Sequence, residues 1–323
     1  MNILITGGAG YIGTKLISYL EESCNVVVFD NFYYNQKQVK YKNNSILSVE
    51  QLFKQKGVRF YEEDITEWSD NLIAEIRKSD VIIPLAALVG APLCDKNPNM
   101  AIELNQLWIE KLVGYCDKQL IIYPNSNSGY GSVNGICTEE TPTNPLSLYG
   151  ETKQNAENYL LENYKNSIVF RLATVFGISN RTRVDLLVND MVRRSINGSI
   201  ELFDGHYRRN YIHVTDVARA FIFAIENQDK MIGEVFNIGA DSLNMTKKDL
   251  VSIICEVSNS SFSEIDNRTD PDKRDYMVSS NKIYKLGFNP LCNNELIFKQ
   301  NIRDLIYFYN DVAPDDLSQL RNY

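Results

Sequence analysis

The chain contains three residues whose side chains could together transfer a proton to or from an alcohol: Tyr149, Lys153 and Ser126. Tyr149 and Lys153 are four positions apart in a stretch with helical character, so their side chains project from one face of a helix. An ammonium group beside a phenol favours the phenolate and lowers the phenol pKa from its ordinary value of about 10. A tyrosine of that kind can take the proton of an alcohol as hydride leaves the same carbon. The pair taken alone fits an ordinary exposed helix better than a catalytic site, so its surroundings must decide.

The surroundings of Ser126 favour a catalytic role. Residues 119–124 form a short apolar run that predicts a buried strand, and the polar segment 125–131 follows it directly. In parallel α/β proteins, ligand sites lie at the carboxyl ends of the strands. A hydroxyl group at that position could hydrogen-bond the same substrate oxygen as Tyr149. The sequence therefore predicts that Ser126, Tyr149 and Lys153 act together on one alcohol.

Residues 1–30 predict a site for a dinucleotide. A short apolar strand runs into a glycine turn, an amphipathic helix follows, and a second strand ends at Asp30. Gly7 allows the tight turn, Gly10 lets the backbone approach a pyrophosphate, and Gly13 lets the helix pack closely on the strand. The helix N-terminus offers free N–H groups to phosphate, and Asp30 would accept hydrogen bonds from the adenosine ribose. Because a 2′-phosphate would meet this carboxylate, the motif favours NAD over NADP.

Strands and helices alternate through the first half of the chain. Further strands are predicted at 58–61, 80–84, 119–124 and 167–176, and helices at 49–56, 68–78, 99–116 and 145–164. These strands are continuous apolar runs, as expected when helices cover both faces of a parallel sheet. Beyond residue 176 the pattern changes, with helices predicted at 185–197, 215–226, 246–258 and 295–309 and strands at 200–203, 210–214 and 235–238.

We therefore expect an α/β fold, a doubly wound parallel sheet of the Rossmann type with a smaller C-terminal lobe that binds substrate. Residues 1–176 are expected to form the NAD-binding domain, and segments of about 208–240 are expected to return to it. Residues 177–323 would mainly form the substrate-binding lobe. No linker of distinct composition separates the two parts.

Composition argues against several other classes of function. The 323 residues carry a formal net charge of −8, which disfavours nucleic acid and anionic membranes as partners. No apolar run reaches the roughly 20 residues of a membrane helix, and Met1 leads directly into the first strand, so we expect no signal peptide. The six cysteines are scattered without a CxxC pair, which is typical of a reduced, cytoplasmic protein. The two histidines, His206 and His213, lack companions with metal-ligand spacing, so no metal site is predicted.

Motifs along most of the chain resemble those of the extended short-chain dehydrogenase/reductase family, which includes NAD-dependent nucleotide-sugar epimerases and dehydratases. The motifs comprise residues 6–13, Asp30, 64–65, 85–87, Ser126, Tyr149, Lys153, 171–177 and 209–214. The resemblance implies that Tyr149 is the catalytic base, that Ser126 orients the substrate hydroxyl and that Lys153 holds the nicotinamide ribose. It implies cofactor contacts from Gly7, Gly10, Tyr11, Ile12, Gly13, Asp30, Asn31, Asp64, Ile65, Leu85, Ala86, Ala87, Asn105, Tyr149, Lys153 and Leu172.

The same resemblance implies which residues meet the substrate. Arg209 and Arg274 match positions that approach the diphosphate of a nucleotide, and a guanidinium group suits phosphate because it can donate two parallel hydrogen bonds. The other implied substrate-binding residues are Ser128, Thr174 and Asn189. The family commonly forms homodimers through two helices, here 99–116 and 145–164. Apolar residues that suit such an interface, or equally packing on the sheet, are Leu104, Leu107, Trp108, Leu112, Leu160 and Leu161.

Departures from the family pattern narrow the reaction. Sugar 4,6-dehydratases carry an acidic pair directly after the catalytic serine or threonine, and this pair moves the protons needed to eliminate water. Asn127 and Ser128 occupy those positions. Neither side chain is a proton-transfer group near neutral pH, so elimination is not expected. Pro84 stands where many members have a histidine, and its missing N–H suggests a locally altered strand end.

Five segments are similar to a narrower group, the bacterial capsule enzymes that oxidise C4 of GDP-D-glycero-α-D-manno-heptose. They are residues 83–94, 125–131, 171–179, 185–190 and 270–276. In that group NAD stays bound and is reoxidised by a keto acid such as 2-oxoglutarate, so the resemblance implies a C4 dehydrogenase with a GDP-linked sugar as substrate. A nucleotide-sugar 4-epimerase needs the same Ser126, Tyr149 and Lys153 and remains an alternative. A non-catalytic NAD-binding protein would be expected to have lost the base or the lysine, and both are intact.

Overall fold

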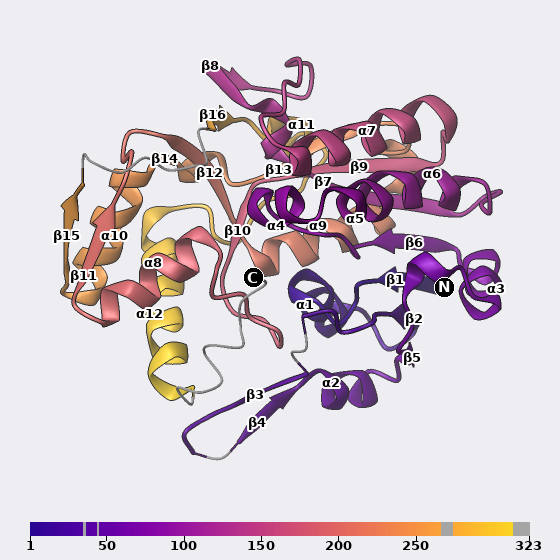
Figure 1. Cartoon of the computed structure of the whole chain (residues 1–323), viewed down its shortest axis with the longest axis horizontal. Coiled ribbons are helices and arrows are strands. Elements are labelled where there is room, and N and C mark those ends of the chain that lie inside the picture. The colour runs from indigo at the N-terminus through magenta and orange to yellow at the C-terminus, as the bar shows by residue number, and fades with distance from the viewer. Residues whose placement is uncertain (35–36, 44, 266–273, 313–323) are drawn as a thin grey trace.

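The computed structural model describes residues 1–34, 37–43, 45–265 and 274–312. Residues 270–273 of the segment 270–276 therefore lie outside the described part. The central sheet contains β1 (Asn2–Thr6), β2 (Asn25–Phe29), β5 (Arg59–Tyr61), β6 (Val81–Pro84), β7 (Leu120–Ser126), β9 (Ser167–Leu172) and β13 (Val235–Ile238). All of its pairs are parallel, in the order β13–β9–β7–β6–β1–β2–β5 (Figure 1). The predicted doubly wound α/β fold is confirmed.

The direction of winding reverses between β1 and β6. From β1 the chain first builds β2 and β5 on one side, and then β6, β7, β9 and β13 on the other. Pro84 is paired with Thr6 in this ladder, and the N–H of the next residue, Leu85, bonds to the Thr6 carbonyl (2.9 Å). In open parallel sheets, ligands bind outside the carboxyl ends of the strands at such a reversal.

Alternate residues of β1 enter two different cores. Ile3 and Ile5 pack with α1 (Tyr11–Tyr19), α2 (Val49–Gln55) and α9 (Val214–Glu226) on one face of the sheet. Leu4 packs with α3 (Asp70–Lys78), α6 (Trp108–Val113) and α7 (Leu148–Asn163) on the other face. All three β1 side chains are fully buried. A strand covered on both faces has no polar side, which explains its unbroken apolar sequence.

The chain leaves the sheet after β9 and later returns to it. The N–H of Ala173 bonds to the carbonyl of Ile238 at the end of β13 (2.9 Å), and the chain then passes to a smaller sheet. That sheet consists of β10 (Thr174–Phe176), β12 (Arg208–His213) and β14 (Asn244–Thr246). The prediction of one strand over 167–176 is therefore wrong, because its two halves pair with different partners. Of the expected returning segments, α9 packs on α1 and β13 forms the sheet edge.

The second lobe has a core of its own. It is enclosed by α8 (Leu187–Ile196), α10 (Lys247–Ser258) and α12 (Glu295–Asp311), and β11 (Ser199–Leu202) pairs with β15 (Ser261–Glu264) beside them. A separate parallel pair consists of β8 (Ser132–Cys137) and β16 (Asp275–Val278). The sequence does not predict β8, β14, β15 or β16, because these short strands find their partners in distant parts of the chain. Short helices elsewhere in the chain include η1 (Ile65–Glu67), η3 (Asn127–Tyr130), η4 (Gln228–Lys230), η5 (Asp241–Leu243) and α11 (Asn281–Tyr284).

A hairpin after the Asp30 loop reaches the second lobe. Its strands are β3 (Gln38–Lys40) and β4 (Ile46–Ser48), and in Figure 1 they extend below α12. Val39 is fully buried in the core of the second lobe. Tyr41 pairs with Val312 and meets the ring of Phe308 edge-on at 6.2 Å between centroids. The polar sequence of this stretch does not predict a hairpin, since α12 supplies the surface that stabilises it.

The predicted helix 99–116 is interrupted. The chain forms α4 (Ala91–Lys96), α5 (Pro98–Ile102), a π-helical turn η2 (Glu103–Leu107) and then α6. Pro98 starts α5, and the wider turn of η2 directs the buried Asn105 inward. Of the apolar residues considered for a dimer interface, Trp108, Leu112 and Leu160 are buried against the sheet. Leu107 is 43% exposed and remains available to a partner.

Three further properties bear on the sequence-based expectations. None of the helices in the described residues is both long and apolar enough to cross a membrane. All six cysteines are free. Among the described residues, no three His, Cys, Asp or Glu side chains are grouped so that they could hold a metal ion.

The partly buried side chain of His213 caps the start of α9. Its Nδ1 accepts a hydrogen bond from the Thr215 N–H (3.3 Å), so the imidazole caps the helix. Gly177 lies against the ring with a φ of +107°, and a Cβ there would fall 2.2 Å from Nε2. Burial lowers the pKa of His213 to about 4. The imidazole is therefore neutral in the folded protein near neutral pH.

We expect His213→Asn to flatten the dependence of stability on acid pH. In the unfolded chain His213 takes up a proton below about pH 6.5, whereas the folded protein resists this until about pH 4. As pH falls through that window, the group costs the wild type up to about 1.4 kcal/mol of unfolding free energy per pH unit. Asparagine keeps a capping acceptor but cannot be protonated. Urea unfolding of both proteins from about pH 4.5 to 7.5 measures the difference, and parallel curves would contradict the expectation.

Candidate active site

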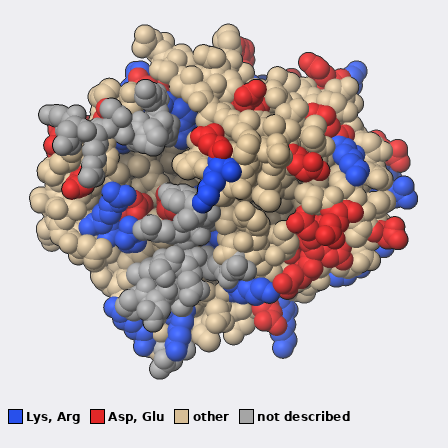
Figure 2. Space-filling view, viewed as in Figure 1, with Lys and Arg blue, Asp and Glu red and all other residues tan. Residues whose placement is uncertain are grey.

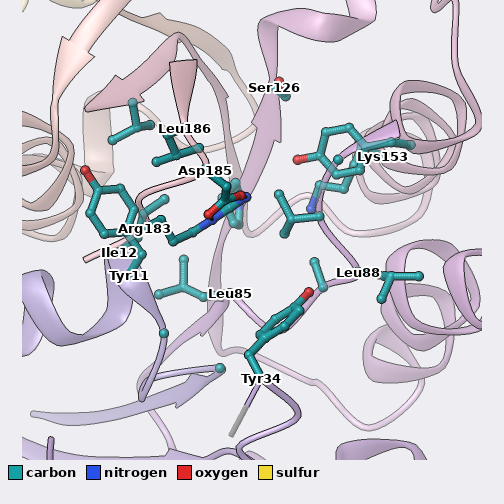
Figure 3. A pocket seen from close by; sticks show the side chains of 18 of the residues that line it. Tyr11, Ile12, Tyr34, Leu85, Leu88, Ser126, Lys153, Arg183, Asp185 and Leu186 are labelled. Carbon is teal, nitrogen blue, oxygen red and sulfur yellow. Dashed lines mark hydrogen bonds and ion pairs between the residues drawn. The ribbon is translucent and has the colours of Figure 1, made fainter. Parts of the chain in front are cut away.

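A cavity of about 1440 Å³ lies between the carboxyl ends of the central strands and the second lobe (Figure 3). Pockets for single drug-sized ligands occupy roughly 300–1,000 Å³, so this cavity has room for two ligands. The predicted site residues that line it are Gly7, Gly10, Tyr11, Ile12, Gly13, Asp30, Asn31, Asp64, Ile65, Leu85, Ala86, Ala87, Ser126, Tyr149, Lys153, Leu172, Thr174, Arg209 and Arg274.

Close contact between two loops shapes one end of the cavity. Gly7 follows β1 with a φ of +70°, and a Cβ there would lie 2.5 Å from the backbone nitrogen of Ala86, which follows β6. A side chain at this position would force the loops apart. Behind Gly10, α1 begins at Tyr11 with no side-chain cap among the described residues and no acidic residue in its first turn. Its N-terminal N–H groups are thus available to an anion, which fits the pyrophosphate of NAD.

Two backbone hydrogen bonds hold Asp30 at the end of β2. Its Oδ2 accepts the Ala9 N–H (3.0 Å) and its Oδ1 accepts the Phe32 N–H (2.8 Å). Burial raises the pKa of this carboxyl group. Beside it, the Asn31 amide donates to Asp64 (2.9 Å) and joins the loops that follow β2 and β5. Each Asp30 oxygen retains a lone pair for a ribose hydroxyl, so this edge fits the adenosine end of NAD.

Tyr149 and Lys153 lie at the start of α7, behind its N-cap Ser147, and both line the cavity. Lys153 is 3% exposed, and its Nζ lies 4.0 Å from the centre of the Tyr123 ring. Burial lowers the pKa of Lys153 to about 7, while the nearby Glu157 carboxylate raises it. The cavity wall thus contains both members of the pair that their spacing predicts on one helix face.

The structure corrects the expectation that Lys153 lowers the pKa of Tyr149. Burial raises it to about 12, instead of Lys153 lowering it. The cations that oppose this rise are Arg183 and Arg274, from the side of the second lobe. The free energy needed to remove the phenolate from water exceeds the stabilisation that these two cations provide. Tyr149 therefore needs further positive charge beside it before it can act as a base at neutral pH.

Ser126 ends β7 at the cavity wall. Its Oγ accepts the Ser128 N–H (3.2 Å), which leaves the hydroxyl hydrogen for a ligand. In Figure 3, Ser126 lies at the strand end and Lys153 reaches into the cavity from α7. Two segments that are distant in sequence thus contribute to one wall, as the sequence predicts.

Three predicted site residues do not line the cavity: Asn105, Ser128 and Asn189. The Asn105 amide is bonded to both backbone groups of Leu88 (2.8 and 3.0 Å) and supports the loop after β6. Asn189 is fully buried, accepting the Gly177 N–H (3.0 Å) and donating to the backbone carbonyl of Arg183 (2.7 Å). Ser128 is 1% exposed, and its hydroxyl has no partner among the described residues. Direct ligand contact by these three stays a prediction.

The side chains that line the cavity also include Tyr34, Arg183 and Asp185, which are not among the site residues predicted from the sequence. Figure 3 shows Arg183 and Asp185 opposite Lys153, with Tyr34 on a third side. Arg183 is buried and paired with Asp185, with 3.2 Å between Nε and Oδ1. Arg181 lies 5.0 Å from the centre of the Tyr34 ring and brings the second lobe onto the N-terminal domain. The one sequence signal for this loop is its concentration of arginines, since Tyr34 alone reads as a packing residue.

The far end of the cavity is cationic although the protein is acidic. Arg209 is 2% exposed, stacks near the Tyr276 ring at 5.5 Å, and donates to the backbone carbonyl of Arg274. An ion pair between Arg208 and Asp275 (2.8 Å) fixes the start of β16 beside them. Outside the cavity, the face in Figure 2 mixes acidic and basic side chains, with acidic ones gathered at its right. Arg209 and Arg274 thus bring positive charge into the cavity although the chain as a whole is acidic.

We expect Asp30→Ala to weaken NAD binding by about 100-fold, because two charge-assisted hydrogen bonds to the ribose, each worth roughly 1.5 kcal/mol, would be lost. The same change should reduce the preference for NAD over NADP, since the repulsion of a 2′-phosphate disappears. Glu62→Ala is the matched control, because it removes an exposed carboxylate from the same edge that does not line the cavity. Calorimetric titration with both dinucleotides measures the effect, and equal losses in the two variants would contradict the assigned role of Asp30.

Comparisons with known proteins agree with this geometry. The sequence model of the NAD dependent epimerase/dehydratase family matches residues 3–239. A Bacillus subtilis (strain 168) relative, named "Uncharacterized UDP-glucose epimerase YtcB", is 30% identical over 275 residues, covering 80% of this chain and 82% of the relative. The Bos taurus dTDP-D-glucose 4,6-dehydratase is 26% identical over 96% of this chain and 88% of its own length.

Solved structures show the same fold. The dTDP-glucose 4,6-dehydratase of Bacillus anthracis, in complex with NAD, has a TM-score of 0.79 at 25% identity and covers 96% of both chains. The UDP-glucuronic acid 4-epimerase of Bacillus cereus, in complex with UDP-glucuronic acid and NAD, has a TM-score of 0.80 at 23% identity over 96% of this chain and 99% of its own. Because the family match extends from β1 through β13 and includes Ser126, Tyr149 and Lys153, this protein belongs to the NAD dependent epimerase/dehydratase family, and NAD is its cofactor.

Proposed function

We propose that this protein uses NAD to oxidise the C4 hydroxyl of a nucleotide-linked sugar. The observation that carries the proposal is that Ser126, Tyr149 and Lys153 line the same cavity as the glycine turn predicted to bind the dinucleotide. The relatives are named as enzymes of UDP- and dTDP-linked sugars, and the cavity has room for such a substrate beside the cofactor. Arg209 and Arg274 bring positive charge to the end where its diphosphate would bind.

Each residue of the wall has a role in this reaction. NAD⁺, when bound, would accept the hydride. Tyr149 takes the proton of the C4 hydroxyl, and the Ser126 hydroxyl donates a hydrogen bond to the same oxygen and orients it. The Lys153 ammonium holds the ribose hydroxyls, and Arg183 and Arg274 oppose the rise of the Tyr149 pKa from the side of the second lobe. The alcohol loses one hydride and one proton and becomes a ketone.

Elimination of water is not part of the proposal. Asn127 and Ser128 stand where sugar dehydratases carry two acids, and both are 1% exposed. Near neutral pH an amide or an alcohol hydroxyl is neither an effective general acid nor an effective general base. The oxidised sugar should therefore keep its C6 hydroxyl.

As substrate we propose GDP-D-glycero-α-D-manno-heptose, converted to its 4-keto form in capsule biosynthesis. The support is the similarity of residues 83–94, 125–131, 171–179 and 185–190 to enzymes of that group, together with the absence of the dehydratase acids. A keto acid such as 2-oxoglutarate is the proposed compound that regenerates NAD⁺. We also propose a homodimer, in which the exposed Leu107 on η2 would face the partner.

A nucleotide-sugar 4-epimerase is the second candidate. The observations that favour it are the fold match to the Bacillus cereus 4-epimerase and the epimerase name of the Bacillus subtilis relative. An epimerase would use the same three residues, but the ketone would turn within the cavity and be reduced on its other face. The two candidates differ in whether the ketone leaves the protein. A non-catalytic NAD-binding protein is disfavoured by the intact base and lysine.

The deciding experiment traps a released ketone. The protein is incubated with GDP-heptose and 2-oxoglutarate, removed by ultrafiltration, and the filtrate is reduced with borodeuteride and analysed by mass spectrometry. One deuterium at C4 supports the dehydrogenase, whereas an unlabelled sugar inverted at C4 supports the epimerase. A sugar returned unchanged would exclude GDP-heptose as substrate, and UDP-, CDP- and dTDP-linked sugars would be tested next.

We expect Tyr149→Phe to lower the rate of C4 oxidation by about 10²–10⁴-fold, because the proton of the alcohol then has no acceptor. NAD affinity should change by no more than about twofold, since the phenol hydroxyl is not needed to hold the phosphates. Tyr159→Phe, on the same helix but outside the cavity, is the matched control. Deuterium incorporation at C4 measures the rate. Undiminished labelling by Tyr149→Phe would exclude this residue as the base.

A further inference from the structure

A buried ion pair lies directly behind the catalytic wall. Glu157 on α7 and Arg171 on β9 are 1% and 6% exposed, with 2.6 Å between Arg171 Nη2 and Glu157 Oε1. The Arg171 Nε also contacts both carboxylate oxygens, at 3.2 and 3.3 Å. Removing two charges from water is costly, and apolar residues of similar volume often give equal stability. Stability alone therefore does not account for the pair.

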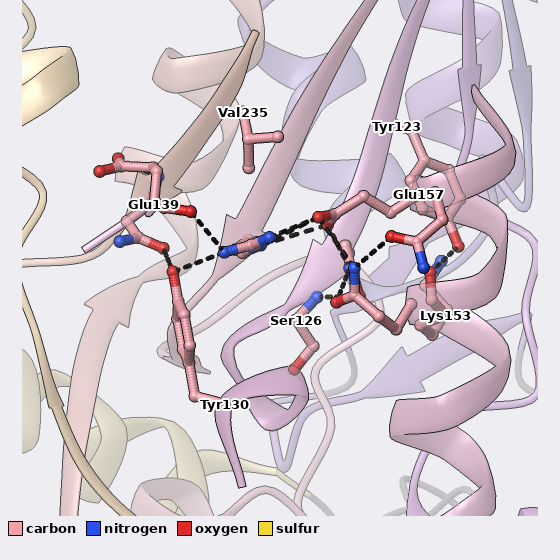
Figure 4. A network of polar contacts seen from close by, with 12 residues as sticks. Tyr123, Ser126, Tyr130, Glu139, Lys153, Glu157 and Val235 are labelled. Atoms are coloured by element: carbon pink, nitrogen blue, oxygen red, sulfur yellow. Dashed lines mark hydrogen bonds and ion pairs between the residues drawn. The ribbon is translucent and has the colours of Figure 1, made fainter. Parts of the chain in front are cut away.

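One route leads from Glu157 to the catalytic serine (Figure 4). The Asn125 amide donates from Nδ2 to Glu157 Oε2, and its Oδ1 accepts the Ser126 N–H (2.7 Å). One side chain thus links the carboxylate to the backbone of Ser126. Because an amide has one donor end and one acceptor end, the carboxylate fixes which end faces Ser126.

A second route runs along α7 to the catalytic lysine. Glu157 follows Lys153 by four residues, which is about one helical turn. The other titratable groups near Lys153 are Cys94 from α4 and Tyr123 from β7, and Tyr149 precedes it by four residues on α7. Burial raises the pKa of Cys94 to about 11, that of Tyr149 to about 12 and that of Tyr123 well above its ordinary value, so all three are neutral near pH 7. Among the described groups that shift the pKa of Lys153, Glu157 supplies the negative charge.

Arg171 is itself anchored on the side away from Glu157. Its Nη1 donates to the Tyr130 hydroxyl (3.0 Å) and to the Glu139 carbonyl (3.2 Å). The Tyr130 hydroxyl in turn donates to Asn237 Oδ1 on β13 (2.7 Å). Figure 4 shows this chain of contacts crossing from the sheet edge to the catalytic helix. The position of the Glu157 carboxylate is therefore set by several elements at once.

We propose that Glu157 is a positioning residue: anchored by Arg171, its carboxylate holds the Asn125–Ser126 segment and keeps a negative charge one turn from the Lys153 ammonium. The inference rests on the proposed function, in which Ser126 acts on the substrate and Lys153 on the cofactor ribose. Without the carboxylate, Lys153 loses its proton at a lower pH, because burial then acts on it without this opposing charge. The Asn125 side chain, which accepts the Ser126 N–H, is then no longer held by the carboxylate.

Three variants separate positioning from folding. Glu157→Gln removes the charge at nearly constant volume, but leaves Arg171 buried without its partner, so a lower melting temperature is expected. Glu157→Gln combined with Arg171→Met removes both charges and should recover part of that stability. Tyr130→Phe is the matched control, because it removes a hydrogen bond from Arg171 and leaves the Glu157 carboxylate in place.

NAD affinity, measured by calorimetry from about pH 6 to 9, is the first readout. In both Glu157 variants the alkaline loss of affinity should begin about one pH unit lower than in the wild type, as expected when one nearby charge is removed. Tyr130→Phe should follow the wild-type profile despite a lower melting temperature. Turnover of the sugar is the second readout, where kcat of the Glu157 variants should fall about tenfold at pH 8 and recover towards pH 6, with KM little changed.

The outcomes distinguish the two proposals. Wild-type pH profiles in both Glu157 variants, with melting temperatures lowered as in Tyr130→Phe, would mean that the pair only holds the fold, and would overturn the inference. A shifted profile of NAD binding without turnover of any nucleotide sugar would support the positioning role of Glu157 and refute the proposed function.

Discussion

The hydroxyl of Tyr11 donates a hydrogen bond to the carbonyl of Gly177 (2.8 Å), and the Ser179 hydroxyl donates to the carbonyl of Tyr11 (2.8 Å). Through these contacts the loop after β10 is fastened to the first turn of α1. Burial raises the pKa of Tyr11 well above its ordinary value, so its hydroxyl keeps the donated proton. The same turn is the predicted site of the pyrophosphate, so the second lobe is held against the helix that begins the predicted cofactor site. The active cavity exists because these two parts meet there.

The enclosure that this contact creates also controls the charges inside the cavity. Burial favours the neutral forms of both proposed catalytic groups, lowering the pKa of Lys153 and raising that of Tyr149. Arg183 opposes the effect on Tyr149, and Glu157 opposes it on Lys153. A water-excluding site strengthens every such interaction, so small displacements of either residue change the proton balance. The chemistry of the wall thus depends on side chains that no catalytic motif contains.

Local sequence was sufficient where one element carries the whole signal. The strand, glycine turn and helix over residues 2–19 appear as predicted, with α1 beginning at Tyr11. The boundaries of β13 at 235–238 were also predicted, because four consecutive residues suffice for a buried strand. The prediction of a single helix over 99–116 was wrong, since the π turn around Asn105 is stabilised by the Leu88 backbone, which comes from another loop. The expected effect of Lys153 on Tyr149 was wrong because spacing on a helix says nothing about burial.

The sequence by itself determined the parallel sheet, the dinucleotide end of the cavity and the shared face of Tyr149 and Lys153. These follow from periodicity, from glycine conformations and from residues a few positions apart, which are local properties of the chain. Only the tertiary structure decided that Asn189 lies behind the cavity wall, that Tyr34 and Arg183 lie within it, and that Glu157 meets Arg171. Those relations join residues from different strands, loops and lobes. They are set by which surfaces pack together, and a side chain's solvation and partners exist only once that packing has formed.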